Sequence, residues 1–450
     1  MVALLTLIST SIFGETMAGL RFLSGLAGAV IVLLSAQIAK LLGGGKFSQA
    51  LAALSICFAP AFPALSSFFS MNPVDIMLCT LFIVLFLKVV EYPSPIKWIV
   101  LGVLLGIRLL NKYTFLVLGF SLLVSLLITK QRSLLRSPWI YISGIIGLLM
   151  FLPHILWQIR YDWPTLEFMH NGMEHKNLHL SLVGFFTQLL IGLNPFTMPL
   201  WLSGVLYLIF SKEMKKYQFL GWTAVVFLIV YLIQNSKVYY VVPIFPLLLS
   251  SGAVVIEKFS QKHMIQWPKY AVVSTMIISG ALLMPLATPL LPVEQFVRYS
   301  KTLGLWNLIR LEKGEGDTLP LHFVYRFGWE ELSDSISKVY NALPQREKER
   351  CAILASWYGP AGAVDHFGSQ HGLPNAICGR NSYWMWGTRN YSGEVVHAVG
   401  FNASYLGKFF DSVEQVAYLK NQYAYDAAIF LCKKPKSSLG EMWPHFKSFI

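Results

Sequence analysis

Apolar runs recur from Met1 to about Leu291, and they constrain the fold of this chain more than any other feature of its sequence. Each run approaches the ~20 residues that a helix needs to cross a lipid bilayer, and short polar segments separate the runs. Hydrophobic residues make up 55% of the chain and charged residues only 13%, which excludes an ordinary soluble protein. The pattern predicts an α-helical polytopic membrane protein.

The predicted membrane domain covers residues 1–291. The run from Met1 to Phe13 is short for a span, so we expect ten or eleven spans in total. The ten candidate spans are residues 18–42, 48–66, 73–90, 95–111, 113–129, 138–157, 190–210, 218–234, 238–256 and 270–291.

After Leu291 the composition becomes globular, and residues 292–450 are expected to form a small water-facing α/β domain. The hydrophobic pattern predicts helices at Gly328–Leu343 and Leu406–Leu419. Short β-branched and apolar runs predict strands at Ala352–Ala355, Val395–Val399 and Ala427–Leu431.

The net charge of +13 lies largely in short loops rather than in a basic stripe, so no nucleic-acid partner is expected. Four cationic loops fall on one side of the predicted domain, and the positive-inside rule makes that side cytoplasmic. The soluble domain is then extracytoplasmic. The loops contain Lys40 and Lys46; Lys130, Arg132 and Arg136; Lys212, Lys215 and Lys216; and Lys258, Lys262 and Lys269.

The five cysteines show no zinc-type spacing, so no structural metal site is expected. Cys57 and Cys79 lie in apolar runs, as core residues do. Cys351, Cys378 and Cys432 lie in the soluble domain, where one disulfide is possible if that domain faces an oxidising compartment.

Asp75 opens a span on the outer side, after Ser70-Met-Asn-Pro-Val. A carboxylate near a helix N-terminus is stabilised by the helix dipole. Two interpretations stay open, a helix cap or first-turn acid and a catalytic or substrate-binding carboxylate.

Two lysines also lie on the outer side, against the positive-inside bias. Lys112 and Tyr113 stand between two spans, and Lys237 stands before Tyr239 and Tyr240. The cations are suited to bind the phosphate of a lipid carrier, and the tyrosines to donate hydrogen bonds or stack on a sugar. Snorkelling and an interfacial aromatic belt are the alternative.

Arg21 begins a span and allows the same two interpretations, with Glu15 as a candidate ion partner.

The stretch His154–His179 is amphipathic and is expected to lie along the outer interface. His170, Glu174 and His175 within it do not have the spacing of a known metal motif, and a solvated helix is the preferred interpretation. In the soluble domain, residues 358–365 and 381–387 are rich in glycine and aromatic residues, which favours turns and packing over sugar stacking.

Taken in order, several stretches resemble the bacterial dolichyl-phosphate-mannose-protein mannosyltransferase-like (C-type) glycosyltransferases, a family related to the lipid A aminoarabinose transferase. In the soluble part the resemblance extends through Phe327-Gly-Trp-Glu-Glu-Leu332, Tyr358–Asp365, Gly372-Leu-Pro374 and Tyr383–Gly387. The membrane stretches are Phe13-Gly-Glu-Thr16 with Leu20–Leu26, Ser70–Asp75, Asn111-Lys-Tyr-Thr114, Pro153–Trp157 with Asp162-Trp-Pro164, and Lys237-Val-Tyr-Tyr240 with Pro243 and Pro246.

The resemblance implies an inverting glycosyltransferase in the bacterial inner membrane. It would move a sugar from a polyprenyl-phosphate donor to a lipid, glycan or protein acceptor at the outer face. Asp75 would act as general base, while Lys237, Tyr239, Tyr240, Lys112 and Arg21 would bind the donor phosphate or sugar. No cofactor is implied, and a divalent metal is not expected.

In the family, a first span and a long outer loop with the principal catalytic acid precede the Phe13-Gly-Glu-Thr16 stretch. We expect that both are truncated or lost in these 450 residues. The alternative functions are a transporter or flippase, which mid-membrane charges and inverted repeats would favour, and a non-catalytic binder of a lipid-linked sugar.

Overall fold

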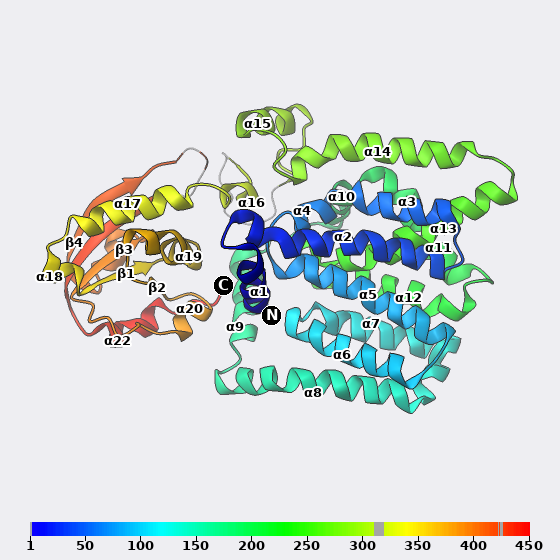
Figure 1. The fold of residues 1–450 in the computed structure, drawn as a ribbon, viewed down its shortest axis with the longest axis horizontal. Helices are drawn as coiled ribbons and strands as arrows, with labels where there is room; N and C mark the ends of the chain where they lie inside the picture. Colours follow the sequence, from blue (N-terminus) through cyan, green and yellow to red (C-terminus); the bar gives the residue numbers. More distant parts are fainter. Residues whose placement is uncertain (1, 310–318, 422, 424–425) are drawn as a thin grey trace. The chain divides into compact units, whose positions relative to one another are not determined.

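A computed structural model describes residues 2–309, 319–421, 423 and 426–450, with the side chain of His322 left aside. The chain divides into two compact units (Figure 1). The first contains Met1–Ile159 and His179–Gly304, and the second contains Arg160–Leu178 and Leu305–Ile450.

The first unit is helical. Short 3-10 turns join several of its helices, among them Lys130–Arg136, Pro195–Thr197, Lys215–Tyr217, Val238–Tyr240 and Val242–Ile244. The helices are α1 (Val2–Phe13), α2 (Met17–Leu41), α3 (Lys46–Cys57), α4 (Ala61–Ser66), α5 (Met71–Glu91), α6 (Pro95–Asn111), α7 (Thr114–Ile128), α8 (Pro138–Arg160), α10 (Leu182–Leu193), α11 (Met198–Phe210), α12 (Gln218–Ile233), α13 (Phe245–Lys262), α14 (Trp267–Ala287) and α15 (Val293–Thr302).

Within the described residues, six helices are long and apolar enough to cross a membrane, or eight spans if each of two bent helix pairs counts as one. The chain is therefore a multi-pass membrane protein. The number is lower than the ten stretches expected from the sequence, for local reasons. The stretch 48–66 is broken into α3 and α4 before Pro60, and α6 has only 17 residues.

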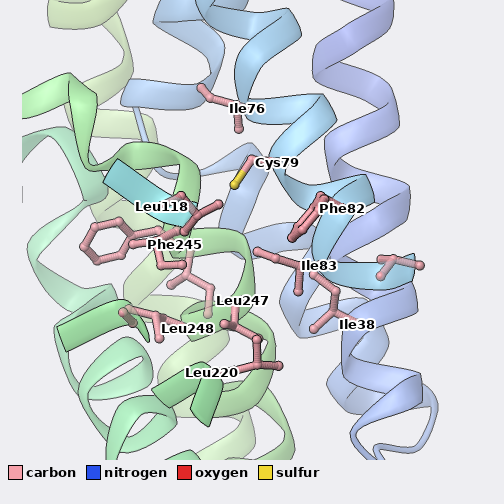
Figure 2. Close-up of a cluster of buried hydrophobic side chains, with 14 of the residues drawn as sticks. Ile38, Ile76, Cys79, Phe82, Ile83, Leu118, Leu220, Phe245, Leu247 and Leu248 are labelled. Atoms are coloured by element: carbon pink, nitrogen blue, oxygen red, sulfur yellow. The ribbon is translucent and has the colours of Figure 1, made fainter. Parts of the chain in front are cut away.

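A core of buried apolar side chains holds the first unit together, and α5 and α13 lie at its centre. Apolar side chains of α5, including Cys79, Phe82 and Ile83, face those of α7, α12 and α13 (Figure 2). In lipid the hydrophobic effect gives no net drive to bring helices together, so close packing of this kind and buried polar contacts must do so. Gly252 of α13 shows how close the packing is, because an added Cβ would lie 1.8 Å from the carbonyl oxygen of Leu200 in α11.

The second unit is an α/β fold, as the sequence predicts. Its helices are α9 (Pro164–Asn171), α16 (Leu321–Val324), α17 (Trp329–Asn341), α18 (Gln345–Lys348), α19 (Tyr358–Phe367), α20 (Ser382–Met385), α21 (Ala403–Leu406) and α22 (Leu439–Met442), with a π-helical turn at Gly172–Lys176 and 3-10 turns at Gly368–His371 and Trp443–Phe446. Its strands are β1 (Cys351–Ala355), β2 (Ile377–Cys378), β3 (Val395–Val399), β4 (Phe410–Leu419) and β5 (Ala427–Pro435).

The five strands form one mixed sheet in the order β2-β1-β3-β5-β4. The pairs of β1 with β2 and β3 are parallel, and the pairs of β5 with β3 and β4 are antiparallel. Both faces of the sheet are covered. Ile353 and Ala355 pack with α17 and α19, whereas Ala352 and Leu354 pack with α22 and the turn after it. This burial on both faces explains why β1 and β3 read as continuous apolar runs.

The strands predicted at 352–355, 395–399 and 427–431 and the helix at 328–343 are confirmed, but the helix predicted at 406–419 is wrong. Residues 410–419 are the edge strand β4. Its apolar residues Phe410, Val413, Val416 and Leu419 are three apart, which mimics a helix. A register shift between Gln415 and Ala417 interrupts the period of two that a regular strand would show.

The possible disulfide is not formed, because Cys351, Cys378 and Cys432 are all free and buried. Burial raises the pKa of Cys378 to about 11 and that of Cys432 to about 12.

The boundary between the two compact units lies later in the chain than the boundary expected from the composition. Helix α15 stays with the first unit, where the Tyr299 hydroxyl donates to the carbonyl of Leu282 in α14.

Candidate functional site

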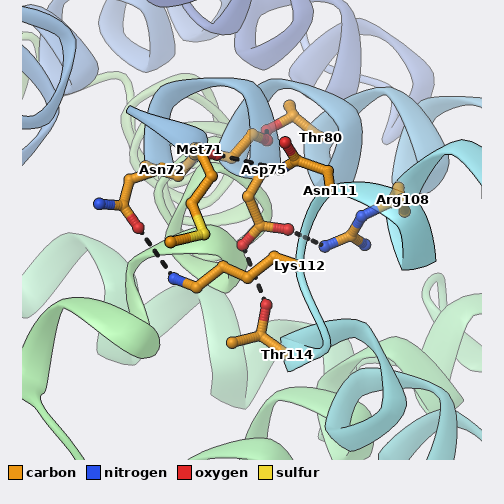
Figure 3. A network of polar contacts seen from close by, with 9 residues as sticks. Met71, Asn72, Asp75, Thr80, Arg108, Asn111, Lys112 and Thr114 are labelled. Atoms are coloured by element: carbon orange, nitrogen blue, oxygen red, sulfur yellow. Dashed lines mark hydrogen bonds and ion pairs between the residues drawn. The ribbon is translucent and has the colours of Figure 1, made fainter. Parts of the chain in front are cut away.

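The start of α5 and the end of α6 meet in a network of polar contacts (Figure 3). Ser70 caps α5 by accepting from the Asn72 amide, and α6 ends at Asn111 because Lys112 has extended backbone angles. The cap is Ser70 and the first turn of α5 holds no acidic residue, so the interpretation of Asp75 as a cap or first-turn acid is wrong.

Three contacts join the two helix ends in antiparallel register. The Arg108 Nη2 donates to Asp75 Oδ1 at 2.9 Å. One turn further along α6, the Asn111 Nδ2 donates to the Met71 carbonyl at 3.0 Å and the Lys112 Nζ to Asn72 Oδ1 at 2.9 Å. Residues 71, 72 and 75 share one face of α5, residues 108 and 111 share one face of α6, and Lys112 directly follows the end of α6.

Asp75 is held on both carboxylate oxygens and is closed off from solvent. Its side chain is 1% exposed and that of Arg108 is 2% exposed. Oδ2 accepts from the Thr114 hydroxyl at 3.1 Å, and the Arg108 guanidinium lies 4.3 Å from the ring centre of Phe115. The Asp75 carboxylate therefore ties α5 to both α6 and α7.

Lys112 lies in the turn between α6 and α7 and is partly exposed. Its ammonium is 4.4 Å from the ring centre of Tyr240 and 5.3 Å from that of Tyr239, within the range of cation–π attraction. Burial lowers the pKa of Lys112 to about 8, the Asp75 carboxylate opposes this shift, and the charges of Arg108 and Lys237 add to it.

The structure thus brings together four residues that the sequence analysis selected from two distant segments: Lys112, Lys237, Tyr239 and Tyr240. The last three belong to one partly exposed segment, and its two tyrosine rings meet edge to face at 4.7 Å. The two rings form one aromatic surface beside the Lys112 ammonium, and we call the rings of Tyr239 and Tyr240 the aromatic wall.

Arg21 is not brought into this network. Its side chain is exposed in α2, and no ion pair to Glu15 or to another described residue forms. The proposed partner Glu15 lies in the turn before α2, one residue ahead of the N-cap Thr16, which accepts from the Gly19 amide.

Sequence reasoning missed Arg108 and the roles of Asn72, Asn111 and Thr114. Arg108 did carry a signal, since an arginine inside an apolar run is expensive and marks a functional region by default. The amides and the hydroxyl carried none, because their role depends on a partner 30 or more positions away in the chain.

A second cluster surrounds the other motif residues of the first unit. The Tyr113 hydroxyl bonds to His154 Nε2, and the Gln158 amide is 3.0 Å from the same nitrogen. His154 also stacks on Phe151 and Trp157 at 5.1 and 5.5 Å. These contacts tie the C-terminal end of α8 to the turn that carries Lys112.

The amphipathic stretch after α8 is tied to the C-terminus within the second unit. The Asn171 amide donates to the Phe449 carbonyl at 2.8 Å, and Lys447 pairs with Glu167 at 2.9 Å. His170 and His175 both lie 3.6 Å from Glu174 on exposed side chains. Among the residues that the structure describes, no group of three metal-ligating side chains gathers.

The glycine-rich stretch 358–365 of the second unit lies in the helix α19. Asp365 accepts from the Ala376 amide at 2.7 Å and from the Tyr383 hydroxyl at 2.8 Å. Burial and the Asp365 carboxylate both raise the pKa of Tyr383. These contacts support the structural interpretation of this stretch.

Comparison with known proteins gives a family match to the N-terminal part of the chain and a fold match to nearly all of it. Residues 1–157, which carry Asp75, Arg108 and Lys112, match the family model described as dolichyl-phosphate-mannose-protein mannosyltransferase. The crystal structure of ArnT from Cupriavidus metallidurans in the apo state superposes with a TM-score of 0.60 at 16% identity, covering 96% of this chain and 86% of that one. The chain has the fold of this ArnT.

A second ArnT structure matches the fold equally well. ArnT from Cupriavidus metallidurans bound to undecaprenyl phosphate gives a TM-score of 0.61 at 14% identity, with 96% and 87% of the two chains covered. A search of curated proteins finds no match. The resemblance predicted from the sequence motifs is confirmed.

Proposed function

We propose that this protein is a membrane glycosyltransferase that takes a sugar from a polyprenyl-phosphate donor. The observation that carries the proposal is the position of Lys112, a partly exposed cation held by Asn72 against the rings of Tyr239 and Tyr240. A cation on an aromatic wall at the end of a membrane helix is suited to the phosphate of a lipid carrier.

The charges of the network favour an anionic ligand. Asp75 and Arg108 neutralise each other, so no carboxylate among the described residues forms an ion pair with Lys112, and Lys237 is close enough to lower the pKa of Lys112. Keeping an unpaired cation in a poorly solvated site costs free energy, and a phosphate would remove that cost.

The comparisons support the same ligand class. One of the matching ArnT structures is bound to undecaprenyl phosphate, a polyprenyl phosphate, and the family model is described by a dolichyl-phosphate sugar donor. The fold and the charged site together make transfer from such a donor the function that we favour over transport.

The proposed reaction is a displacement at the anomeric carbon of the donor sugar. An acceptor hydroxyl oxygen forms the new bond to that carbon, and the bond from the carbon to the phosphate oxygen breaks. The polyprenyl phosphate leaves with the electron pair and the hydroxyl proton passes to a base. Attack opposite the leaving group inverts the anomeric centre. Lys112 and Lys237 would stabilise the charge that develops on the phosphate.

The acceptor remains within the classes named above, a lipid, a glycan or a protein. We place the reaction at the outer face of a bacterial cell membrane, with the second unit on the same side, because the cationic loops mark the other side as cytoplasmic. No cofactor or metal is part of the proposal.

The experiment is transfer of a radiolabelled sugar from polyprenyl-phosphate donors to membrane acceptors, with binding of undecaprenyl phosphate measured in parallel. Lys112→Ala and Lys237→Ala should each lower donor binding about 10- to 100-fold, the loss expected for a charge-assisted hydrogen bond. Lys216→Ala is the control, because Lys216 is an exposed lysine that pairs with Glu91 elsewhere in the first unit.

Binding without transfer from any donor would favour the non-catalytic binder. Equal affinity of the two lysine variants and the wild type for undecaprenyl phosphate would contradict the assignment of the site.

A further inference from the structure

The network has two layers that differ in exposure. Asp75 and Arg108 are each 1% exposed, whereas Asn72, Lys112, Tyr239 and Tyr240 are partly exposed. A ligand that reaches the outer layer meets the lysine and the tyrosines, and the ion pair lies behind them. The inner pair therefore has no direct access to a reacting group.

A general base needs a lone pair within hydrogen-bond reach of the proton that it removes. Asp75 Oδ1 accepts from Arg108 at 2.9 Å and Oδ2 from Thr114 at 3.1 Å. Both carboxylate oxygens are directed toward these donors (Figure 3), and the side chain is 1% exposed. The geometry argues against direct proton abstraction by Asp75.

We infer that the Asp75–Arg108 ion pair is a positioning device, which fixes the helix ends so that Lys112 is held against the aromatic wall where the donor phosphate binds. The inference rests on the proposed function and replaces the catalytic role expected for Asp75 with an indirect one. Arg108 enters the site as a second positioning residue.

The register of the contacts explains how the ion pair acts at a distance. Arg108 lies in the last turn of α6 and Lys112 directly follows the end of that helix, while their partners Asp75 and Asn72 lie close to one turn apart on α5. Rotation or sliding of either helix end would break both contacts together. Thr114, two residues after Lys112 in the chain, also donates to Asp75. Asp75 is therefore bonded to residues on both sides of Lys112 in the sequence.

A purely stabilising ion pair is a weaker explanation. Desolvation of two charges offsets most of their attraction, so apolar side chains of similar volume would usually stabilise a buried site as well or better. Arg108 also leaves Nε and Nη1 without a hydrogen-bond partner among the described residues. Such a costly arrangement is better explained by the geometry that it imposes.

The test compares Asp75→Asn, Arg108→Gln and the double variant Asp75→Asn/Arg108→Gln in the full detergent-solubilised chain. The double variant has no carboxylate but keeps a neutral amide pair that can bridge α5 and α6. We expect each single variant to weaken undecaprenyl phosphate binding about 10-fold or more, and the double variant to regain most of that affinity.

The kinetics separate positioning from catalysis. Loss of a general base lowers kcat about 10²- to 10⁴-fold in every variant that lacks the carboxylate. A positioning role predicts that the single variants change chiefly KM for the donor and that the double variant has a kcat within about 10-fold of wild type. A double variant with the kcat of Asp75→Asn would overturn the inference.

A third measurement does not require turnover, so it tests the inference even if the protein transfers no sugar. The rate of Lys112 acetylation against pH, measured by mass spectrometry, reports its protonation. The charged groups that act on it are Asp75, Arg108 and Lys237, and the rings of Tyr239 and Tyr240 face it. Asp75→Asn should move the midpoint to lower pH and the double variant should move it back.

An unchanged midpoint in Asp75→Asn would show that the pair does not set the state of Lys112, and the inference would fall even if transfer is observed. A shifted midpoint of Lys112 acetylation, without any binding of undecaprenyl phosphate, would instead reject the proposed function. The ion pair would then position Lys112 for something other than a phosphate.

Discussion

The carboxylate of Asp75 and the guanidinium of Arg108 meet at 2.9 Å between the start of α5 and the end of α6, and both side chains are about 1% exposed. The two charges of the pair neutralise each other, and Lys112, four residues after Arg108, is the partly exposed cation of the network. We expect the neutral buried pair to govern the stability of the site, and the Lys112 cation to govern its pH dependence and ligand binding.

Breaking the buried pair on one side should destabilise the first unit. Asp75→Leu leaves the Arg108 cation buried and unpaired, which costs roughly 3–5 kcal/mol in comparable sites. The double variant Asp75→Leu/Arg108→Leu removes both charges and should be much closer to wild type. Thermal unfolding in detergent compares the three proteins. A double variant as unstable as Asp75→Leu would show that the lost packing, and not the unpaired charge, decides stability.

Phosphate binding should weaken as the pH rises through about 8, the pKa to which burial lowers Lys112. Below this pH the lysine is charged, and above it the free site loses the cation that the phosphate needs. Affinity for undecaprenyl phosphate should therefore fall up to about 10-fold per pH unit above pH 8. Binding is measured from pH 7 to 9.5. Lys112→Arg should remove the dependence, since arginine stays charged throughout. A flat profile in wild type would contradict the assignment.

The two tyrosines should contribute unequally. The Lys112 ammonium is closer to the ring of Tyr240 than to that of Tyr239, at 4.4 against 5.3 Å. A cation–π contact contributes about 0.5–2 kcal/mol, or roughly 2- to 30-fold in binding. Tyr240→Leu should thus cost more donor affinity than Tyr239→Leu, and Tyr240→Phe should retain the ring effect. Isothermal titration with undecaprenyl phosphate orders the variants, and a larger loss for Tyr239→Leu would be inconsistent with this geometry.

Mild acid should loosen the sheet of the second unit through His397. This side chain in β3 is 1% exposed, and both ring nitrogens lack a hydrogen-bond partner among the described residues. Burial, with a smaller effect of Lys433, lowers its pKa to about 4. The unfolded state binds a proton below its ordinary pKa while the folded state does not, so stability falls between about pH 6.5 and 4, by roughly 3 kcal/mol in all.

Hydrogen exchange of β3 in the full chain, corrected for intrinsic rates, measures this loss between pH 7 and 5. His397→Leu places an apolar side chain that cannot be protonated at the buried position, so the hydrogen-exchange protection of β3 should be the same at both pH values. Equal pH dependence in the variant and the wild type would assign the effect to other groups.

Much of the architecture could be predicted from the sequence because it depends on local patterns. Apolar runs of membrane-spanning length predicted the helices of the first unit, and continuous apolar runs predicted β1, β3 and β5. The failures were also local. The irregular edge strand β4 imitates a helical period, and the break between α3 and α4 was hidden inside a continuous apolar stretch.

The sequence by itself determined that the chain crosses a membrane, that an α/β unit follows, and that Lys112, Lys237, Tyr239 and Tyr240 were candidates for one site. Only the tertiary structure decided that Asp75 is enclosed by Arg108 and Thr114, and that Lys112 is partly exposed beside Tyr239 and Tyr240. The physical reason is that burial and pairing depend on side chains brought together from 33 or more positions apart, and no local pattern encodes that distance.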